Sequence, residues 1–342
     1  MAESMAKHRI FSGIQPTGEP HLGNYLGAIR QWVEQQDAAA PHDALYSIVD
    51  YHALTIEMEA GALDRHTLEL TASLVACGLD PARVTLFRQS DVPEHTELGW
   101  IFSCLAAMGD LQRMTQFKDK AEQNRDNINV GLFTYPVLQA ADILLYHADL
   151  VPVGEDQLQH LELVRECARR FNRRFGDTFP EPQPLLSKVP RLKGLDGSAK
   201  MSKSKGNTVV LSEPPEQIRA KLKVAVTDPA RLRRNDPGHP EVCNVFTLHG
   251  FFTAPRDPAR VEAIERDCRS AALGCVDCKK ELADRMLDHL GPIRDRQAAL
   301  RARPDDLRDL LEAGRRKAAE IARATMETVR ERIGVRVPRP RQ

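Results

Sequence analysis

The sequence predicts an α/β protein in which a doubly wound parallel sheet is followed by a helical domain. Short apolar runs alternate with amphipathic segments in the first part of the chain, whereas from Pro215 onward the pattern is helical with no convincing strand. The length of 342 residues favours about two domains. We expect the α/β domain over 1–207, with a helical insertion at about 105–180, and the helical domain over 208–342.

The expected elements follow in order along the chain. Strands are predicted at 9–13, 45–49 and 84–87, and helices at 24–36, 63–77, 98–108, 136–146 and 156–175. The first helix has Leu22, Leu26, Ile29 and Val33 at the i, i+4, i+7, i+11 spacing of one buried face. Residues 14–20 have the composition of a turn-rich loop, and residues 180–190 that of a proline-broken connection.

Composition and charge narrow the class of protein. Hydrophobic residues make up 42% and charged residues 28%, which is typical of a globular protein rather than a disordered or fibrous one. No run of about 18 uncharged apolar residues occurs and no apolar signal core follows residues 1–9, so we expect a cytoplasmic protein without a membrane segment. Residues 1–199 hold 18 Lys and Arg against 27 Asp and Glu, whereas residues 200–342 hold 30 against 21. A basic C-terminal part fits contact with phosphates, although a solvated helical surface also carries many charges.

The first motif joins the first strand to the first helix. It reads Gln15-Pro16-Thr17-Gly18 and then His21-Leu22-Gly23-Asn24. It lacks the phosphate-loop and dinucleotide-binding patterns. A helix N-terminus after a strand nevertheless presents free N–H groups to an anion, and Gly23 has no side chain to keep a nucleotide from the backbone. The alternative is an ordinary strand-to-helix turn.

The second motif is the lysine loop, which reads Ala-Lys-Met-Ser-Lys-Ser-Lys-Gly-Asn over 199–207. Alone, such a loop is usually solvated surface. Together with the earlier motif it resembles the two hallmark sequences of class I aminoacyl-tRNA synthetases, the His-Ile-Gly-His type and the Lys-Met-Ser-Lys-Ser type. The second match is identical over five residues.

Further stretches narrow the resemblance, namely Ile10–Pro16, Arg113–Lys118, Ala140–Tyr146 and Val151–Gln157. Together they resemble the bacterial-type tryptophanyl-tRNA synthetase family, densely from about residue 9 to 228 and less beyond. The resemblance implies a Rossmann-like catalytic domain, a C-terminal tRNA- and anticodon-binding domain, and a homodimer. The implied substrates are L-tryptophan, ATP and tRNA(Trp). Alternatives are a tyrosyl-specific synthetase of the same fold and a tryptophan-binding regulatory paralogue that does not charge tRNA.

The implied chemistry is attack of an amino-acid carboxylate on the α-phosphate of ATP. Because the nucleophile is already ionised, catalysis depends on positioning and on neutralising phosphate charge. By resemblance, the catalytic residues are Lys200, Lys203, Gln15 and Asn24, with Mg²⁺ on the phosphates and Lys118 or Lys120 as further cations. The full set expected to bind ATP is Gln15, Pro16, Thr17, Gly23, Asn24, Gly154, Glu155, Asp156, Leu192, Lys200, Met201, Ser202, Lys203 and Ser204.

Asp142 is the candidate for amino-acid choice. It lies in the apolar run Ala140–Leu145, where an unpaired carboxylate is costly to bury, so it needs a donor. The indole N–H is a donor only, and the family places an aspartate here to accept it. By the same resemblance Phe11 and His52 line the ring, while Tyr135 and Gln157 address the amino group and carboxylate. The alternatives are a surface or capping aspartate and a structural histidine at 52.

The chain also departs from the family's common pattern. Gln139 replaces a methionine that is frequent before Ala-Ala-Asp, and Lys205-Gly206 stands where Asp-Pro is frequent. We interpret these differences as marks of a subgroup rather than of lost function. Gln139 bears on the polarity of the pocket.

Four of the seven cysteines, Cys243, Cys268, Cys275 and Cys278, are spaced C-x24-C-x6-C-x2-C. A reducing cytosol disfavours disulfides. Four thiolates can bind zinc or hold an iron–sulfur cluster, and spacing alone does not choose among a cluster, zinc and unligated thiols. A subset of tryptophanyl-tRNA synthetases carries a [4Fe–4S] cluster on a very similar spacing near the anticodon, which makes a cluster the expectation and zinc the alternative.

Overall fold

The computed structural model describes residues 8–36, 43–114, 129–186, 189, 192–198, 201–203 and 205–335. The chain forms two compact units, each assembled from separate stretches. The first unit comprises residues 1–18, 32–188 and 303–342, and the second comprises 19–31 and 189–302. These are structural units; the functional division expected at residue 207 stays a prediction.

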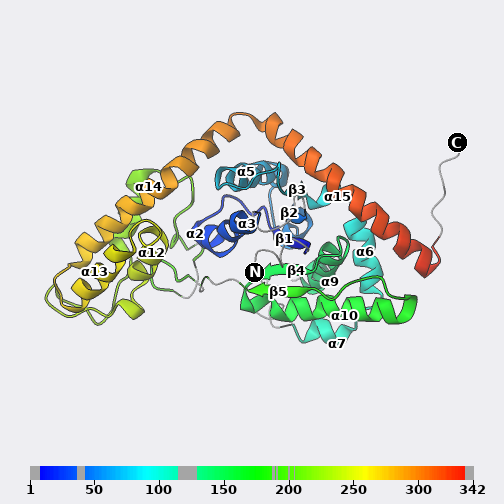
Figure 1. Ribbon diagram of the computed structural model, residues 1–342, viewed down its shortest axis with the longest axis horizontal. Helices are drawn as coiled ribbons and strands as arrows, with labels where there is room; N and C mark the ends of the chain where they lie inside the picture. Colours follow the sequence, from blue (N-terminus) through cyan, green and yellow to red (C-terminus); the bar gives the residue numbers. More distant parts are fainter. Residues whose placement is uncertain are drawn as a thin grey trace. The chain divides into compact units, whose positions relative to one another are not determined.

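A parallel sheet forms the centre of the first unit (Figure 1). In the described residues its strands are β1 (Ile10–Ile14), β2 (Ala44–Ile48), β3 (Thr85–Arg88), β4 (Leu150–Val153) and β5 (Gln183–Leu186). Their order is β3-β2-β1-β4-β5, and every neighbouring pair is parallel. The carboxyl ends of all strands therefore lie at one edge, with the change of winding direction between β1 and β4, where open α/β sheets bind ligands.

Helices surround this sheet, as the alternating sequence pattern predicts. They are α4 (Asp50–Ala53), α5 (Ala62–Ala76), α6 (Glu94–Ser103), α7 (Met108–Gln112), α9 (Val130–Leu144), α10 (Leu158–Phe175) and α15 (Pro304–Ile333), with 3₁₀ turns η2 (Gln89–Asp91) and η3 (Glu155–Gln157). The predicted strands at 9–13, 45–49 and 84–87 are confirmed within about one residue. The predicted α/β class with a helical C-terminal region is likewise confirmed.

Proline misled the sequence analysis at three positions. β4 was not predicted, and β5 lies where a proline-broken connection was expected, because Pro152 and Pro184 argue against strands. β5 is an edge strand, where a missing N–H is tolerated. Pro136 lies inside α9, which begins six residues before the predicted start with Asn129 as its N-cap.

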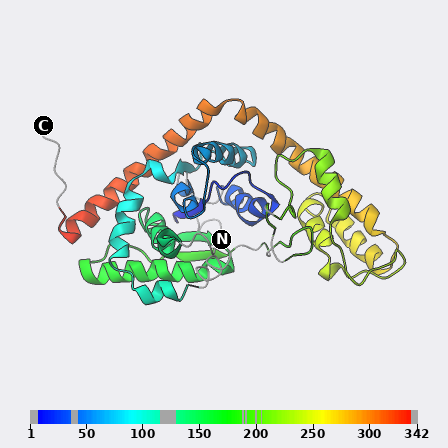
Figure 2. The same ribbon diagram turned by 180° about the vertical axis from the view of Figure 1, so that it is seen from behind.

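Helix α15 covers β3, the opposite edge of the sheet. The contact is backbone to backbone, because a side chain on Gly314 would collide with the carbonyl of Leu86. Arg330 of α15 forms a bidentate ion pair with Glu97 of α6. The long C-terminal helix can be followed from behind in Figure 2. The last helix of the chain is therefore part of the sheet-containing unit.

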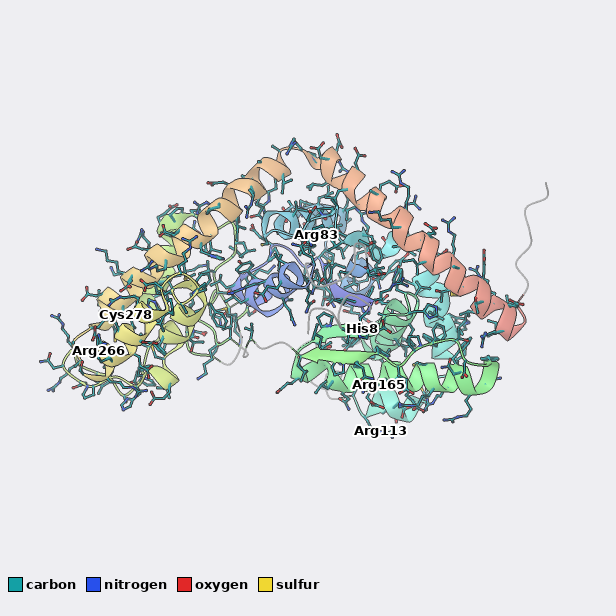
Figure 3. The ribbon with its side chains drawn as sticks, viewed as in Figure 1. His8, Arg83, Arg113, Arg165, Arg266 and Cys278 are labelled. Atoms are coloured by element: carbon teal, nitrogen blue, oxygen red, sulfur yellow. The ribbon has the colours of Figure 1, made fainter. Side chains whose placement is uncertain are left out.

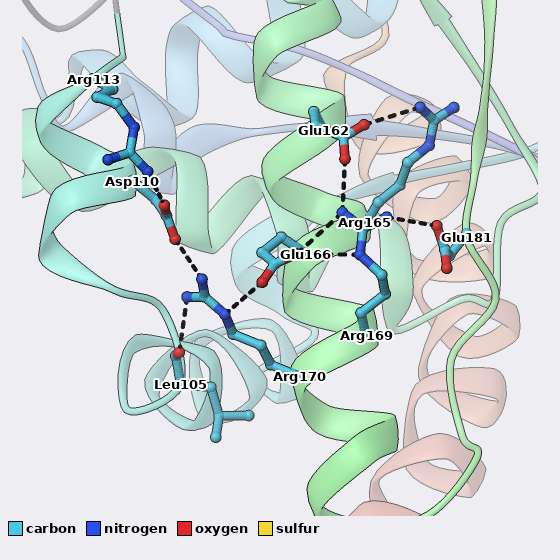
Figure 4. Close-up of polar contacts among 9 residues, drawn as sticks. All are labelled: Leu105, Asp110, Arg113, Glu162, Arg165, Glu166, Arg169, Arg170 and Glu181. Carbon is cyan, nitrogen blue, oxygen red and sulfur yellow. Dashed lines mark hydrogen bonds and ion pairs between the residues drawn. The ribbon is translucent and has the colours of Figure 1, made fainter.

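An ion-pair network on α10 fixes the neighbouring elements of the same unit (Figure 4). Arg169 reaches Glu162, Glu166 and Glu181. Arg170 pairs with Glu166 and with Asp110 of α7, and donates to the carbonyl of Leu105. Such partly exposed pairs contribute modestly one by one, but here they join α7 to α10.

The described residues of the second unit are helical apart from loops and one isolated bridge. It contains α2 (Leu22–Asn24), the π-helical segment η1 (Tyr25–Ile29), α11 (Pro215–Val224), η4 (Pro240–Val242), α12 (Asn244–Phe252), α13 (Pro258–Arg269) and α14 (Cys275–Arg301), while α3 (Arg30–Gln35) continues from η1 into the first unit. The Tyr25 hydroxyl lies 2.6 Å from Nε2 of His289 on α14, which ties the residue after the first motif to that helix. Within the described part of the chain, no helix combines the length and the apolar character that crossing a bilayer requires.

Candidate active site

Most of the expected site residues of the first unit follow the carboxyl ends of its strands. Gln15 follows β1, His52 lies just after β2, and Gly154 follows β4. Gln89, which the sequence analysis did not select, comes directly after β3. Because parallel strands end at one edge, the fold gathers these residues on the side where ligands bind.

Asp142 is the buried centre of this group. It lies near the end of α9 with a side chain 2% exposed, among Ala140, Ala141, Ile143 and Leu144. Its Oδ2 accepts a 2.7 Å hydrogen bond from His52 Nε2, and its Oδ1 accepts 2.7 Å hydrogen bonds from Gln89 Nε2 and His95 Nδ1. Burial alone would raise the pKa of Asp142, but attraction to His52 and hydrogen bonds from both histidines outweigh it and hold that pKa below its usual range. The carboxylate is therefore charged and acceptor-only at neutral pH.

Aromatic rings surround the carboxylate. Phe11 of β1 is buried and stacks on Tyr146 with ring centroids 5.5 Å apart. The rings of His52 and Tyr135 meet edge to face at 6.2 Å. The Tyr135 hydroxyl lies 2.7 Å from His160 Nε2, and burial, together with the charge of Asp156, raises the pKa of Tyr135 to about 12. Phe11, His52, Tyr135 and Asp142 thus belong to one cluster.

The remaining tryptophan candidate, Gln157, lies apart from these hydrogen bonds. It is half-buried in η3 and donates to Asp156 Oδ2 at 3.0 Å. Glu155 and Asp156 are exposed. A Cβ on Gly154 would lie 2.8 Å from Asp156 Oδ1, so the glycine lets this carboxylate fold back on the turn. In the first motif, Thr17 N donates to Gln15 O at 2.9 Å, while Pro16 is buried between them.

Sequence analysis missed three residues of the Asp142 cluster: Gln89, His95 and Tyr146. One signal was available for His95, because it shares the buried face of α6 with Leu98 and Phe102 at i, i+3, i+7 spacing. A histidine on an apolar helix face needs a buried partner. No comparable local signal marks Gln89 or Tyr146, whose roles depend on packing between distant segments.

In the second unit, the His21–Asn24 motif and the lysine loop lie together. Leu22 N donates to Val209 O at 2.9 Å, and His21 forms an isolated antiparallel bridge with Val210. His21 Nδ1 accepts from Gly23 N at 3.0 Å, and Asn24 Oδ1 accepts from His21 N at 3.1 Å. A Cβ on Gly23 would lie 2.7 Å from the His21 ring, so this turn requires glycine.

Hydrogen bonds of Ser202 and Met201 hold the described part of the lysine loop. Ser202 N donates to Asn207 Oδ1 at 2.7 Å, and buried Met201 accepts from Thr208 Oγ1 at 3.4 Å. Lys203 is exposed, and its Nζ donates to the backbone carbonyl of Glu19 at 2.9 Å. Leu192 is buried. Lys200, Ser204, Lys118 and Lys120 lie outside the described residues.

Two side chains of α14 hold Glu19, the residue to which Lys203 donates. The Glu19 carboxylate accepts from Gln297 at 3.2 Å and from Arg301 at 2.8 Å, both on α14. The carbonyl of Glu19 is thereby fixed by side chains of a long helix in the same unit. Lys203 donates to a neutral backbone oxygen. A phosphate can readily replace this contact, because hydrogen bonds between charged groups are stronger.

The four late cysteines lie within electrostatic range of one another in the second unit. Cys243 precedes α12, Cys268 is on α13, and Cys275 and Cys278 begin α14, where Figure 3 labels Cys278. Burial raises the pKa of Cys278 to about 12, and the other three cysteines add to the shift. A bound cation would lower the pKa of these thiols, because metals bind cysteine as the thiolate. Four thiols are therefore suitable donors for a metal ion or a cluster. Nevertheless, among the described residues no three His, Cys, Asp or Glu side chains are arranged to hold a metal ion.

Comparison with known proteins defines the class. The family model for tRNA synthetases class I (W and Y) matches residues 3–291. This match covers most of the chain, including both motifs and the Asp142 cluster. The chain therefore belongs to the class I tRNA synthetase family whose members handle tryptophan and tyrosine.

Near-full-length relatives narrow the class to the bacterial tryptophanyl-tRNA synthetases. The chain is 50% identical over 332 residues to the tryptophan–tRNA ligase of Deinococcus radiodurans, covering 95% of this chain and 98% of the relative. It is 45% identical over 336 residues to that of Wolinella succinogenes, covering 97% and 100%. A crystal structure of tryptophanyl-tRNA synthetase from Campylobacter jejuni, complexed with ADP and tryptophan, superposes with a TM-score of 0.84 at 34% identity and covers 95% of this chain and 99% of that one.

Proposed function

We propose that this chain activates L-tryptophan with ATP, releasing pyrophosphate, and then transfers the tryptophanyl group to tRNA(Trp). The observation that carries this proposal is a charged, acceptor-only carboxylate buried beneath aromatic rings. An indole has one polar atom, an N–H donor, on a large apolar ring, and Asp142 with Phe11 and His52 complements both features. Tyr135 and Gln157 are assigned to the amino group and carboxylate of the ligand.

The activation step requires positioning of two charged reactants. The carboxylate of tryptophan attacks the α-phosphate of ATP, so the protein has to align them and stabilise charge on the pyrophosphate. We assign charge stabilisation to Lys203 and Lys200, and nucleotide contact in the second unit to Gly23, Asn24, Leu192, Met201, Ser202 and Ser204. By the same resemblance Gln15, Pro16, Thr17 and Gly154–Asp156 are assigned to ATP, and Mg²⁺ would accompany its phosphates.

Amino-acid-dependent exchange of pyrophosphate into ATP tests this function. Exchange dependent on tryptophan but not on tyrosine, followed by charging of tRNA(Trp), is the expected result. Exchange dependent on tyrosine would instead establish the tyrosyl alternative. Tryptophan binding without exchange would establish the regulatory paralogue, and either result would overturn the proposal.

A [4Fe–4S] cluster on Cys243, Cys268, Cys275 and Cys278 is part of the proposal. Its support is the spacing of these four free cysteines and the closeness of Cys243, Cys268 and Cys275 to Cys278, whose pKa their charges help to raise. The cluster would cross-link α12, α13 and α14 and so stabilise this part of the second unit. Anaerobic purification with a visible spectrum and assays for iron, acid-labile sulfide and zinc tests it: about four irons and four sulfides per chain are expected. One zinc per chain, or no metal in a protein that still charges tRNA, would refute the cluster.

Two further expectations concern partners. Three basic residues of α14 beside the cysteines, Lys279, Lys280 and Arg285, are proposed to meet the tRNA backbone. A homodimer is proposed on the exposed apolar residues Trp100 of α6 and Met108 of α7. Light scattering should give twice the chain mass for the wild type and a lower mass for Trp100→Glu.

Because the proposed reaction charges tRNA for translation, we propose that the protein acts in the cytoplasm.

A further inference from the structure

The hydrogen bonds around Asp142 divide its two oxygens into different roles. We propose that His95, held by Tyr146, is a positioning residue that fixes Oδ1 of Asp142 and leaves Oδ2 alone to recognise a ligand N–H. His95 would then determine the preference for an aromatic ring that carries one donor over an isosteric ring that carries none. This inference rests on the proposed function, since it assigns the ligand contact within the same site.

Gln89 provides one fixed donor to Oδ1. Its Oε1 accepts a 3.1 Å hydrogen bond from the backbone N–H of Tyr51, which determines the orientation of the amide. Its Nε2 must therefore be the end that donates to Asp142 Oδ1 at 2.7 Å. Gln89 is fully buried, so solvent does not compete for this donor.

His95 provides the second donor to Oδ1. A carboxylate only accepts, so Nδ1 of His95 carries the hydrogen in the 2.7 Å contact. The other ring nitrogen, Nε2, lies 2.8 Å from the Tyr146 hydroxyl and can accept a hydrogen bond from it. Burial, followed by the charges of Asp142 and Glu94, raises the pKa of Tyr146 well above its usual value, so this hydroxyl keeps its proton and donates. Tyr146 thus selects the tautomer of His95 that can donate to Asp142.

Counting lone pairs shows what remains for a ligand. Each carboxylate oxygen accepts about two hydrogen bonds. Oδ1 receives two, from Gln89 and His95, and is saturated. Among the described residues, Oδ2 receives one, from His52, which leaves it one further acceptor position. The carboxylate therefore has one acceptor position left, which we assign to the ligand N–H.

The packing explains why His95 keeps its place. Its side chain is fully buried, and its ring stacks on Phe87 with centroids 6.0 Å apart. Tyr146 is also fully buried and stacks almost parallel on Phe11. One tyrosine therefore orients both the histidine that fixes Asp142 and the phenylalanine assigned to the ligand ring.

The test compares tryptophan with 3-(benzothiophen-3-yl)alanine, in which sulfur replaces the indole N–H. Dissociation constants would be measured for the wild type, His95→Leu, His95→Asn and Tyr146→Phe. We expect the wild type to prefer tryptophan by about 10- to 100-fold, the scale of one hydrogen bond to a buried charge. His95→Leu should bring the ratio close to one while leaving analogue binding within a few-fold. His95→Asn, whose amide places a donor near the position of Nδ1, should restore most of the preference.

The outcomes separate the possible failures. Equal weakening of both ligands by His95→Leu, or an unchanged ratio, would overturn the positioning role while leaving the proposed function intact. A wild type with no preference would overturn the assignment of Oδ2, and one that binds neither ligand would overturn the proposed function itself. If His95→Leu does not fold, Tyr146→Phe decides: it removes one oxygen and should lower the ratio roughly three- to tenfold.

Discussion

The Asp142 cluster and the lysine loop solve different problems with different physical means. The cluster is buried, three side chains donate hydrogen bonds to its central carboxylate, and its members come from β1, α4, η2, α6 and α9. Lys203, in contrast, is an exposed cation whose recorded hydrogen bond goes to a neutral backbone carbonyl. Recognition of one amino acid requires donors and acceptors that are already in position before the ligand binds. Stabilising the phosphates of ATP requires a cation that can exchange its hydrogen-bond partner for a phosphate.

The largest effect is expected for Asp142→Asn, which keeps the shape of the side chain but removes its charge. In the native protein Gln89, His95 and His52 donate hydrogen bonds to the carboxylate. The amide NH₂ of the introduced asparagine is itself a donor, so it would face at least one of these donors without an acceptor. We expect the apparent KM for tryptophan in pyrophosphate exchange to rise about 10²-fold or more, with the KM for ATP changed less than threefold. Equal increases for both substrates would indicate general misfolding and contradict the assigned role.

Lys203→Ala tests the other side of the comparison. Loss of one charge-stabilising donor should lower the rate of tryptophan activation by roughly 10²-fold, with tryptophan affinity and thermal stability nearly unchanged. Lys205→Ala is the matched control, because Lys205 is an exposed lysine two positions along the same loop. Equal rate losses for both variants would show that only the general positive charge of the loop matters.

Gly314→Ala tests whether the Asp142 cluster depends on the packing of α15 against β3. A methyl group at 314 would collide with the carbonyl of Leu86 and push α15 from β3, the strand that leads into Gln89. We expect a loss of about 1–3 kcal/mol in the free energy of unfolding, together with a higher KM for tryptophan. Gly291→Ala in α14 is the control, since a Cβ there lies 3.9 Å from its nearest neighbour. A destabilisation by Gly291→Ala as large as that by Gly314→Ala would remove the steric explanation.

The smallest effect concerns pH in the second unit. Burial, followed by the charges of Arg30 and Arg256, lowers the pKa of His289. A histidine with a lowered folded pKa binds protons more readily when unfolded, so stability falls as the pH drops through about 6.5, by at most about 1.4 kcal/mol per pH unit for one group. Denaturant titrations at pH 7.5 and 5.5 should therefore show a smaller acid loss for His289→Gln than for the wild type. An identical loss in both proteins would contradict this assignment.

The sequence analysis selected the centres of both candidate sites but missed several of the side chains that surround Asp142. Asp142 could be selected because local polarity conflicts with its apolar neighbours, and Lys203 because its motif is contiguous. Gln89 and Tyr146 could not, because Gln89 meets Asp142, and Tyr146 meets His95, only after β3, α6 and α9 pack together. Likewise β5 was mistaken for a loop, since the tolerance of an edge strand for Pro184 depends on sheet order, which local patterns do not contain.

The central claim is that one oxygen of a buried aspartate recognises the indole N–H. A crystal structure of the protein with L-tryptophan bound tests it most directly. The account predicts the indole nitrogen at about 2.7–3.2 Å from Oδ2 of Asp142, with Gln89 and His95 still on Oδ1. An indole nitrogen bonded to any other group, or His95 displaced from Oδ1 by the ligand, would contradict it.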